Sequence, residues 1–315
     1  MNRSVPPRYR TFLYIVLFPT VIGAFSPDSI FEPLMRNFDF LPDYYLRFNI
    51  SAFALHRDEF LKRQYLAESR SDLEFRFFSF KDIVSSVWDV DFRFGLGEIP
   101  DNVVFTVLNV RFGIDPKIEV KLPRVLLSTG LSHFCCHEVD RKYFPLIYNN
   151  LLHIEAFSYN YRINEYFKTI NNNSDFVHRN RIAWKVKAGY YLKEFFGLVG
   201  TNKLNGNSPF VSEWSSNVRY AFYKRKSWLF SATGETAFGL FDTNDGYHVK
   251  NDTRIYWKES FGIEAFFTRG TRGVNFYLNY HLDDLPASPN DPDFTMGNSR
   301  LSKHGLAEIG VLFFN

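Results

Sequence analysis

The chain has 315 residues, a formal net charge of +3 at pH 7 and two adjacent cysteines, Cys135 and Cys136. The near-balance of charge, without a concentrated basic stripe, argues against a nucleic-acid-binding protein. Two neighbouring cysteines cannot build a disulfide framework. Aromatic residues make up 19% of the chain. Because they are spread over short segments of alternating polarity, they are typical of the aromatic girdles of a transmembrane β-barrel.

The N-terminus predicts a secretory signal peptide. MNRSVPPRYR contains arginines and no acidic residue, and the apolar run TFLYIVLFPTVIGAF follows it. This run is shorter than the roughly 20 residues of a membrane-spanning helix, and Gly23 and Ala24 offer a cleavage point. We therefore expect a signal peptide at residues 1–24 and a single barrel domain at residues 31–315.

The segment SVWDVDFRFG, Ser86–Gly95, predicts a β-strand with two different faces. Apolar residues such as Phe92 alternate with charged residues such as Asp91, a period of two that a helix would not keep separate. In an outer-membrane barrel the apolar face contacts lipid, while the charged face lines a wet lumen.

The rest of the chain repeats this pattern between turn-forming pieces such as GEIPDN, NNNSD and FDTNDGYH. One further run leads into Leu127, and the final stretch GLAEIGVLFFN also alternates. The other runs are Tyr44–Leu55, Leu73–Phe80, Val103–Ile114, Leu151–Ile163, Arg181–Tyr191, Val218–Tyr223, Ser227–Leu240, Thr253–Phe267 and Val274–Leu282. We predict an all-β fold, an antiparallel up-and-down transmembrane β-barrel of about 12 strands, in the outer membrane of a Gram-negative-type bacterium.

The expected partners follow from this location. They are the lipids of the outer membrane and the barrel insertion machinery, with no nucleic acid; the oligomeric state stays open. Outer-membrane barrels typically end on an aromatic residue that the insertion machinery reads. This chain resembles them in its penultimate residue, Phe314, and departs from them in its last residue, Asn315.

The segment LSTGLSHFCCHEVDR, Leu127–Arg141, concentrates the side chains that could carry chemistry. On a strand, His133, Cys135 and His137 share one face, and Glu138 belongs to the other. The preceding residues on the first face are apolar. If that face contacts lipid, the three residues continue up the outer wall to the level of the lipid headgroups.

Part of this segment, GLSHFC, resembles the G-x-x-H-x-S arrangement of outer-membrane phospholipases and lipid A deacylases. The resemblance implies that His133 is the base and that Cys135 stands where those families have serine. A thiolate beside an imidazole is a good nucleophile. The orienting residue would be Asp140, provided that the chain bends after His137, or else Glu138, which points to the opposite face.

A wider resemblance connects the chain with an uncharacterised family of bacterial outer-membrane barrels, known only as a domain of unknown function, with the signature H-x-S-S-H-x-G-D-E. HFCCHEVDR keeps His133, His137 and Asp140, and has cysteines in place of both serines. FEPLMRNFDF and FYLNYHLDDLPASPNDPDF resemble the opening of that family and one of its later strands with its S-P-N loop. This resemblance implies the barrel fold and no activity.

Non-catalytic interpretations remain open for the same residues. The cluster can be the polar end of a structural strand. As zinc ligands, His133 and His137 would sit roughly 13 Å apart on a strand, too far to converge on one ion. The loop DLPASPNDPDF could hold calcium through Asp284, Asp291 and Asp293, although it lacks the glycine and glutamate of an EF-hand. We predict no metal and no cofactor.

Two classes of function therefore follow from the sequence. The first is a non-enzymatic envelope protein that acts as a structural element, a narrow conduit or a surface binder. The alternative is a lipid acyl hydrolase that uses His133 and Cys135 at the outer-leaflet boundary. The distinguishing feature is a carboxylate or an amide behind the imidazole of His133.

Overall fold

The computed structural model describes residues 38–41, 43–55, 66–97, 106–138, 147–162, 181–192, 210–242, 253–269, 272–283 and 304–315. The chain forms two compact units, Met1–Asp39 and Phe40–Asn315. A short strand, β1 (Phe38–Phe40), spans their boundary. The predicted signal peptide lies outside the described residues.

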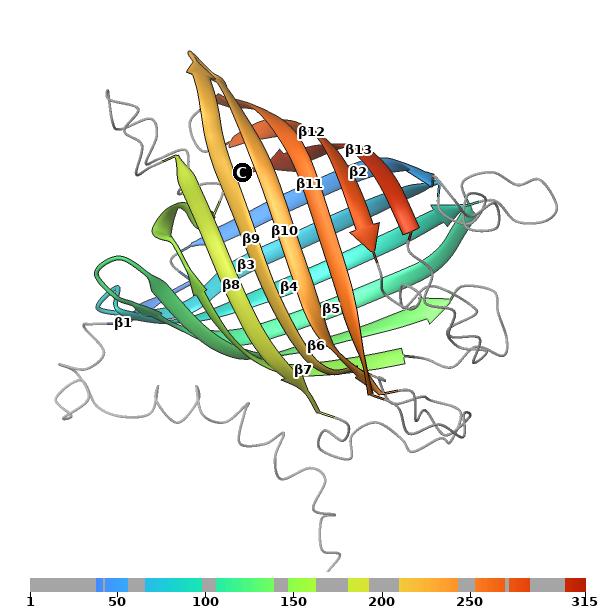
Figure 1. The fold of residues 1–315 in the computed structure, drawn as a ribbon. Coiled ribbons are helices and arrows are strands. Elements are labelled where there is room, and N and C mark those ends of the chain that lie inside the picture. Colours follow the sequence, from blue (N-terminus) through green and yellow to red (C-terminus); the bar gives the residue numbers. More distant parts are fainter. Residues whose placement is uncertain are drawn as a thin grey trace, which may run out of the picture. The chain divides into compact units, whose positions relative to one another are not determined.

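Twelve further strands form a barrel in the second unit, each antiparallel to the next along the chain (Figure 1). They are β2 (Tyr44–Leu55), β3 (Ala67–Phe80), β4 (Val84–Gly97), β5 (Thr106–Lys121), β6 (Leu126–Glu138), β7 (Ile147–Phe157), β8 (Ile182–Tyr191), β9 (Phe210–Arg225), β10 (Trp228–Asp242), β11 (Thr253–Arg269), β12 (Arg272–Asp283) and β13 (His304–Phe314).

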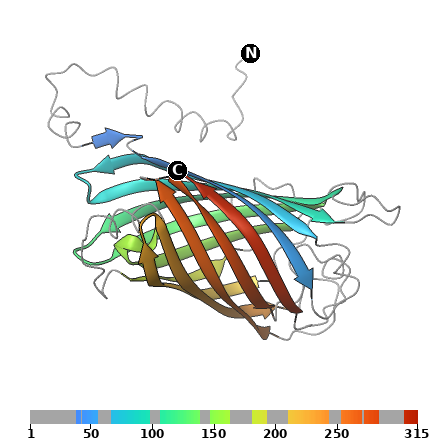
Figure 2. The same cartoon turned by 90° about the horizontal axis from the view of Figure 1, so that it is seen from above.

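The sheet closes on itself because its last strand pairs with its first. β13 pairs with β2 from Leu306–Leu55 to Phe314–Arg47, and β3 pairs with both β2 and β4. Figure 2 shows β13, in red, beside β2, in blue. Closure leaves none of these twelve strands with an open edge, which a bilayer would not tolerate. The predicted antiparallel barrel of about 12 strands is confirmed.

β9 shows where the sequence pattern was too weak to give the strand its full length. The predicted run Val218–Tyr223 is only the later part of a strand that begins at Phe210. Ser215, Ser216 and Asn217 interrupt the apolar alternation there. Pairing with β8 and β10 on both sides holds this polar stretch in the sheet regardless of its own preference.

β5 extends past the predicted end at Ile114 and contains a proline, Pro116. Proline has no N–H to donate to a ladder of hydrogen bonds. Pro116 still lies opposite Trp88 of β4, and the register is continuous there, from Val84–Val120 to Gly95–Asn109. Toward β6, however, the pairing stops at Ile114 and resumes at Lys117. The wall is therefore locally unpaired beside the strand that carries the candidate site.

The two faces of the barrel wall differ in polarity, as the alternation predicted. In β4, Phe92 and Phe94 lie on the outside and are 41% and 38% exposed. Between them, Arg93 faces the lumen and binds Asp91, with 2.9 Å from Nε to Oδ1. An apolar outer wall around a polar lumen is the arrangement that a lipid bilayer requires of a barrel.

The two ends of the barrel differ in the length of their connections. At one end, residues 81–83, 122–125, 226–227 and 270–271 suffice to join successive strands, while all connections at the other end are longer. Because outer-membrane barrels have short periplasmic turns and longer extracellular loops, the short-turn end is the periplasmic one. The β7–β8 connection, residues 158–181, is the exception, and it begins with a 3-10 turn, η2 (Tyr159–Tyr161).

Among the described residues, no helix is long and apolar enough to cross a membrane.

A first prediction tests the closed barrel. The protein is expected to fractionate with the outer membrane and to migrate differently on a gel before and after boiling, because a closed barrel resists detergent until it is heated. Membrane fractionation and a gel-mobility assay measure this. Recovery in the soluble periplasmic fraction, with one mobility under both conditions, would contradict the architecture.

Candidate functional site

The candidate residues on β6 lie on the outer wall of the barrel. In the register with β5, His133 pairs with Ile114 and Cys135 with Phe112, and Phe112 in turn pairs with the outward-facing Phe92. Both residues are nearer to the long-loop end of β6 than to its short turn. The site therefore faces the membrane in the extracellular half of the wall, on the face that the alternation predicted.

The imidazole of His133 has an amide behind it. On the neighbouring strand β7, Asn150 lies directly opposite His133, and 2.6 Å separate His133 Nδ1 from Asn150 Oδ1. An imidazole that donates its Nδ1 hydrogen to this oxygen keeps the lone pair on Nε2, the tautomer that a general base needs. Asn150 is 7% exposed, so solvent competes little for this hydrogen bond.

The sequence reasoning missed Asn150. The predicted orienting residues were Glu138 on β6 and Asp140 just beyond it, whereas the amide that the structure places beside the imidazole of His133 comes from the next strand, β7. The signal was present in YNNLLHIEAF, where Asn150 shares a parity with the apolar Leu152 and Ile154. A polar residue among the lipid-facing residues of a strand indicates a partner or a functional site at that position.

Cys135 lies on the same face as His133, two residues further along β6. Its side chain is 7% exposed, and Phe112 is its cross-strand neighbour on β5. The ring of Phe112 packs against Phe92, with 4.9 Å between the ring centroids. The thiol is therefore set between larger side chains on the outer wall.

The other predicted members of the cluster are only partly placed. Backbone pairing puts His137 opposite Val110 and Glu138 opposite Asn109. The side chains of both residues, and the whole of Asp140, lie outside the described residues. The same holds for the proposed calcium ligands Asp284, Asp291 and Asp293.

The glycine of the GLSHFC motif has a structural role on the lumen side. A Cβ on Gly130 would lie 2.7 Å from Lys117 Cβ and 2.8 Å from the Pro116 carbonyl oxygen. Gly130 thus lets β6 approach β5 where Lys117 packs against it. The glycine in the resemblance to phospholipases is explained by packing and does not itself support catalysis.

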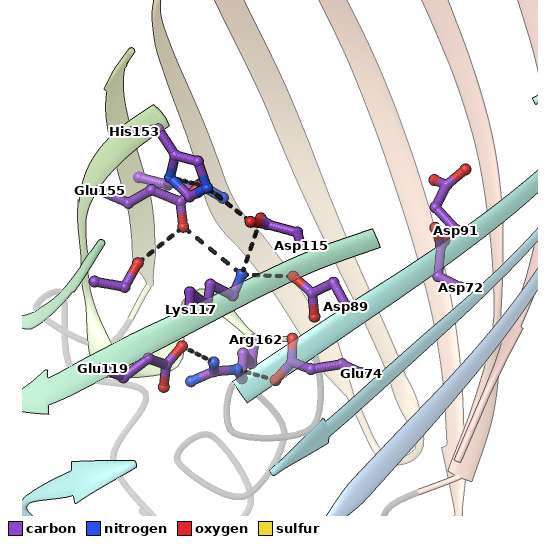
Figure 3. A network of polar contacts seen from close by, with 12 residues as sticks. Asp72, Glu74, Asp89, Asp91, Asp115, Lys117, Glu119, His153, Glu155 and Arg162 are labelled. Atoms are coloured by element: carbon purple, nitrogen blue, oxygen red, sulfur yellow. Dashed lines mark hydrogen bonds and ion pairs between the residues drawn. The ribbon is translucent and has the colours of Figure 1, made fainter. Parts of the chain in front are cut away.

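Lys117 is the centre of a buried charge network on the lumen wall (Figure 3). Its Nζ lies 2.5 Å from Asp89 Oδ2, 3.8 Å from Glu155 Oε2 and 3.9 Å from Asp115 Oδ2, and its side chain is 5% exposed. Glu155 also binds Lys185, at 2.6 Å. One cation is thus shared among three carboxylates that come from three different strands.

A histidine joins this network. His153 Nε2 lies 2.8 Å from Asp115 Oδ1, and its side chain is fully buried. His153 points to the lumen, as expected for a residue of opposite parity to Asn150 on β7. The network is therefore separate from the outer-wall site, although β5 and β7 contribute residues to both.

A second group of ion pairs, centred on Arg162, lies toward the periplasmic end of the lumen wall. Arg162 follows η2 and binds Glu74 of β3 and Glu119 of β5 (Figure 3). A cavity of about 330 Å³ lies beside it at the short-turn end and is lined by Arg162, Glu119 and Tyr159 among others. The start of the β7–β8 connection is thus anchored to the lumen wall by ion pairs.

No group of three or more His, Cys, Asp or Glu side chains that could hold a metal ion occurs within the described part of the chain. The absence of zinc from the purified protein stays a prediction.

No protein-family model and no curated protein matches the chain. Its relation to the uncharacterised barrel family is therefore a resemblance of motifs only.

Solved structures of outer-membrane proteins are similar to this chain at very low sequence identity. A KdgM porin is 8% identical over 85% of this chain and 98% of its own, with a TM-score of 0.41. Outer membrane phospholipase A from Escherichia coli is 10% identical over 86% and 89%, with a TM-score of 0.44. OmpT, an outer membrane protein of Vibrio cholerae, is 8% identical over 87% and 97%, with a TM-score of 0.36. At these TM-scores the similarities support no conclusion about the function of this chain.

The closed barrel, its apolar outer wall and its charged lumen together define the class of the protein. It is an outer-membrane β-barrel protein of a Gram-negative envelope.

Proposed function

We propose that the protein is a lipid-directed acyl hydrolase in which Cys135 is the nucleophile, His133 the base and Asn150 the orienting residue. The hydrogen bond between His133 Nδ1 and Asn150 Oδ1, 2.6 Å long, carries the proposal. An amide behind the imidazole distinguishes a nucleophile–base–orienter set from a solvated histidine at a strand end. The resemblance of GLSHFC to the phospholipase motif supports the same roles for His133 and Cys135.

The proposed reaction proceeds through a thioester. Nε2 of His133 takes the proton from Cys135, and the thiolate attacks the carbonyl carbon of an acyl ester. The carbon–oxygen bond to the alcohol breaks, and the imidazolium returns the proton to the departing oxygen. Water, deprotonated by His133, then hydrolyses the thioester and releases the fatty acid. Asn150 holds the ring in one orientation throughout both steps.

The position of the site determines the class of substrate. A nucleophile on the outer wall, in the extracellular half, meets the ester bonds of membrane lipids without a solvent-filled pocket. Because Cys135 is 7% exposed, an ester reaches its sulfur only after a flanking side chain such as Phe112 moves aside. The substrate is therefore a lipid whose acyl chain packs against the outer wall.

The experiment compares fatty acid release and lipid composition with matched variants. Purified protein is mixed with lipid extracted from the outer membrane, and the lipids of cells with and without the protein are profiled. Cys135→Ala and His133→Ala are each expected to lower the rate at least a thousandfold, as for other nucleophile–base pairs. Cys135→Ser is expected to keep part of the activity, and Cys136→Ala, the neighbouring thiol, to keep all of it.

Substitutions of Asn150 test whether its hydrogen bond orients the imidazole of His133. Asn150→Ala is expected to lower kcat with little change in KM, because the asparagine acts on the base and not on the lipid. Asn150→Asp, which can still accept the Nδ1 hydrogen, is expected to recover activity. Identical lipid profiles for wild type and Cys135→Ala would rule out the hydrolase and leave the non-enzymatic role.

The second candidate is a narrow conduit, favoured by the charged inner wall. Lys117, Asp89 and Glu155 belong to a lumen surface where polar side chains replace an apolar filling. Planar-bilayer recordings test this. A conduit is expected to show discrete conductance steps whose size or ion selectivity changes in Glu155→Gln, whereas the absence of steps would exclude it.

A further inference from the structure

Glu259 is a carboxylate on the lipid-facing side of the barrel. It lies on β11 between Trp257 and Phe261, which share its parity and are 54% and 56% exposed. The registers with both neighbouring strands are unbroken, and Glu259 pairs with Thr236 of β10 and with Leu282 of β12. Among the described side chains, it is the one carboxylate that has apolar outward residues on both sides along its strand.

Glu259 lies within the hydrocarbon layer and not at its border. The apolar outer face of β11 extends from Ile255 to Phe267, which are 69% and 42% exposed. At about 3.3 Å per residue and a strand tilt of about 40°, these residues span roughly 30 Å of height, which matches the hydrocarbon thickness. Glu259, four positions inside Ile255, is roughly 10 Å below the upper border. A carboxylate at that depth is costly unless a partner satisfies it.

The residues beside Glu259 form a shallow polar notch. In the strand register, Glu259 is followed by Thr236 on β10 and Ser216 on β9, all at outward positions. We call these three residues the polar row. They are small apart from the glutamate, and larger rings surround them. Phe238 stacks on Trp214 on the long-loop side, with 6.4 Å between the ring centroids.

We propose that the polar row is the contact surface for a second copy of this chain, in a two-fold symmetric dimer within the membrane. The row carries one strong acceptor, the carboxylate of Glu259, and two hydroxyl donors, Thr236 and Ser216. A two-fold axis through the row brings the acceptor of each copy against the donors of the other. The same surface thus supplies both halves of each hydrogen bond, as an isologous interface requires.

The shape of this surface is self-complementary in the same sense. On one side of the axis, Trp257 and Phe261 project from β11. On the other side, Thr236, Ser216 and Gly234 leave the wall low, since a Cβ on Gly234 would meet only the Phe261 ring, at 4.0 Å. Two-fold symmetry places the projecting rings of one copy over the low region of the other. A lipid acyl chain would fill the notch but offers no donor to the carboxylate.

The experiment measures the mass of the full-length mature protein by analytical ultracentrifugation in detergent, and by native mass spectrometry from lipid nanodiscs. Wild type is expected to be a dimer. Glu259→Leu is expected to raise the dissociation constant at least tenfold, while the gel-mobility shift on boiling confirms a folded barrel. Ser71→Leu is the matched control, because Ser71 also faces outward, between Phe48 and Phe92, on the distant strand β3. It is expected to remain dimeric.

A swap of roles makes the test specific to complementarity. Ser216→Glu places two carboxylates in each row and is expected to give monomers. Ser216→Glu combined with Glu259→Ser exchanges the two ends of the row, which restores one acceptor and two donors and is expected to restore the dimer. A wild type that stays monomeric in detergent and in nanodiscs would overturn the proposal, as would a Glu259→Leu variant that dimerises as tightly as wild type.

Discussion

Lys117→Met is expected to lower the free energy of unfolding by about 3–5 kcal/mol, because it removes the buried cation shared by Asp89, Asp115 and Glu155 and takes from Asp89 the cation that lies nearest to it. Methionine has nearly the volume of lysine, so the loss reports charge more than packing. Urea unfolding in lipid vesicles, followed by tryptophan fluorescence, measures it.

Lys121→Met is the matched control for this measurement. Lys121 pairs with Asp82 at the short-turn rim, where the two side chains are 45% and 66% exposed. Its loss is expected to change the free energy of unfolding by less than about 1 kcal/mol. Adding Asp89→Asn to Lys117→Met removes the carboxylate charge that lay nearest to the lost cation and is expected to recover part of the loss. Equal effects of the two lysine variants would mean that the network contributes no more than a surface ion pair.

Phe92→Arg is expected to cost about 2–4 kcal/mol, since it places a guanidinium against hydrocarbon near the middle of the wall. The same unfolding assay measures this cost. Phe92→Leu is the control, because leucine keeps an apolar side chain at the same exposed position and loses mainly the ring contact with Phe112. Equally small effects of both substitutions would place Phe92 outside the membrane.

Asp91, next to Phe92 on the lumen-facing side of β4, is also expected to be sensitive to substitution. From the alternation alone, a change at a lumen-facing residue should be mild, because water surrounds it. Asp91 instead binds Arg93 and also Arg70 Nη2 at 2.8 Å, and its side chain is 22% exposed. Asp91→Asn therefore leaves two guanidinium groups with a weaker partner and is expected to destabilise the wall measurably.

The fold was largely predictable because every strand of a membrane-spanning barrel must alternate apolar residues that face lipid with polar residues that face the lumen. Alternation alone gave the bounds of Tyr44–Leu55. It failed where residues of the wall are neither clearly apolar nor charged, as at Ser215 and Ser216, and where a local breaker, Pro116, is held by pairing with β4. In both places the neighbouring strands decide the conformation, and their influence does not show within one segment.

The site was predictable only in part, for a related reason. His133 and Cys135 are two residues apart, so their common face follows from the period of a strand. Asn150 lies 17 residues from His133, and its contact depends on the register of β6 with β7. No pattern within the predicted strands sets that register. Glu259 could have been noticed from parity alone, but its significance depends on the donors that pairing places beside it.

The seam between β2 and β13 has a consequence for how the barrel assembles and comes apart. Leu46 N donates to Asn315 Oδ1 at 2.8 Å across a sequence separation of 269 residues. Among the twelve strands from β2 to β13, every other pairing joins strands that are consecutive along the chain and can form as a local hairpin, while the seam carries the largest loss of loop entropy. It is therefore expected to form last and to open first. A lateral gap in this protein, whether during insertion or under denaturant, would appear between these two strands before any other pair.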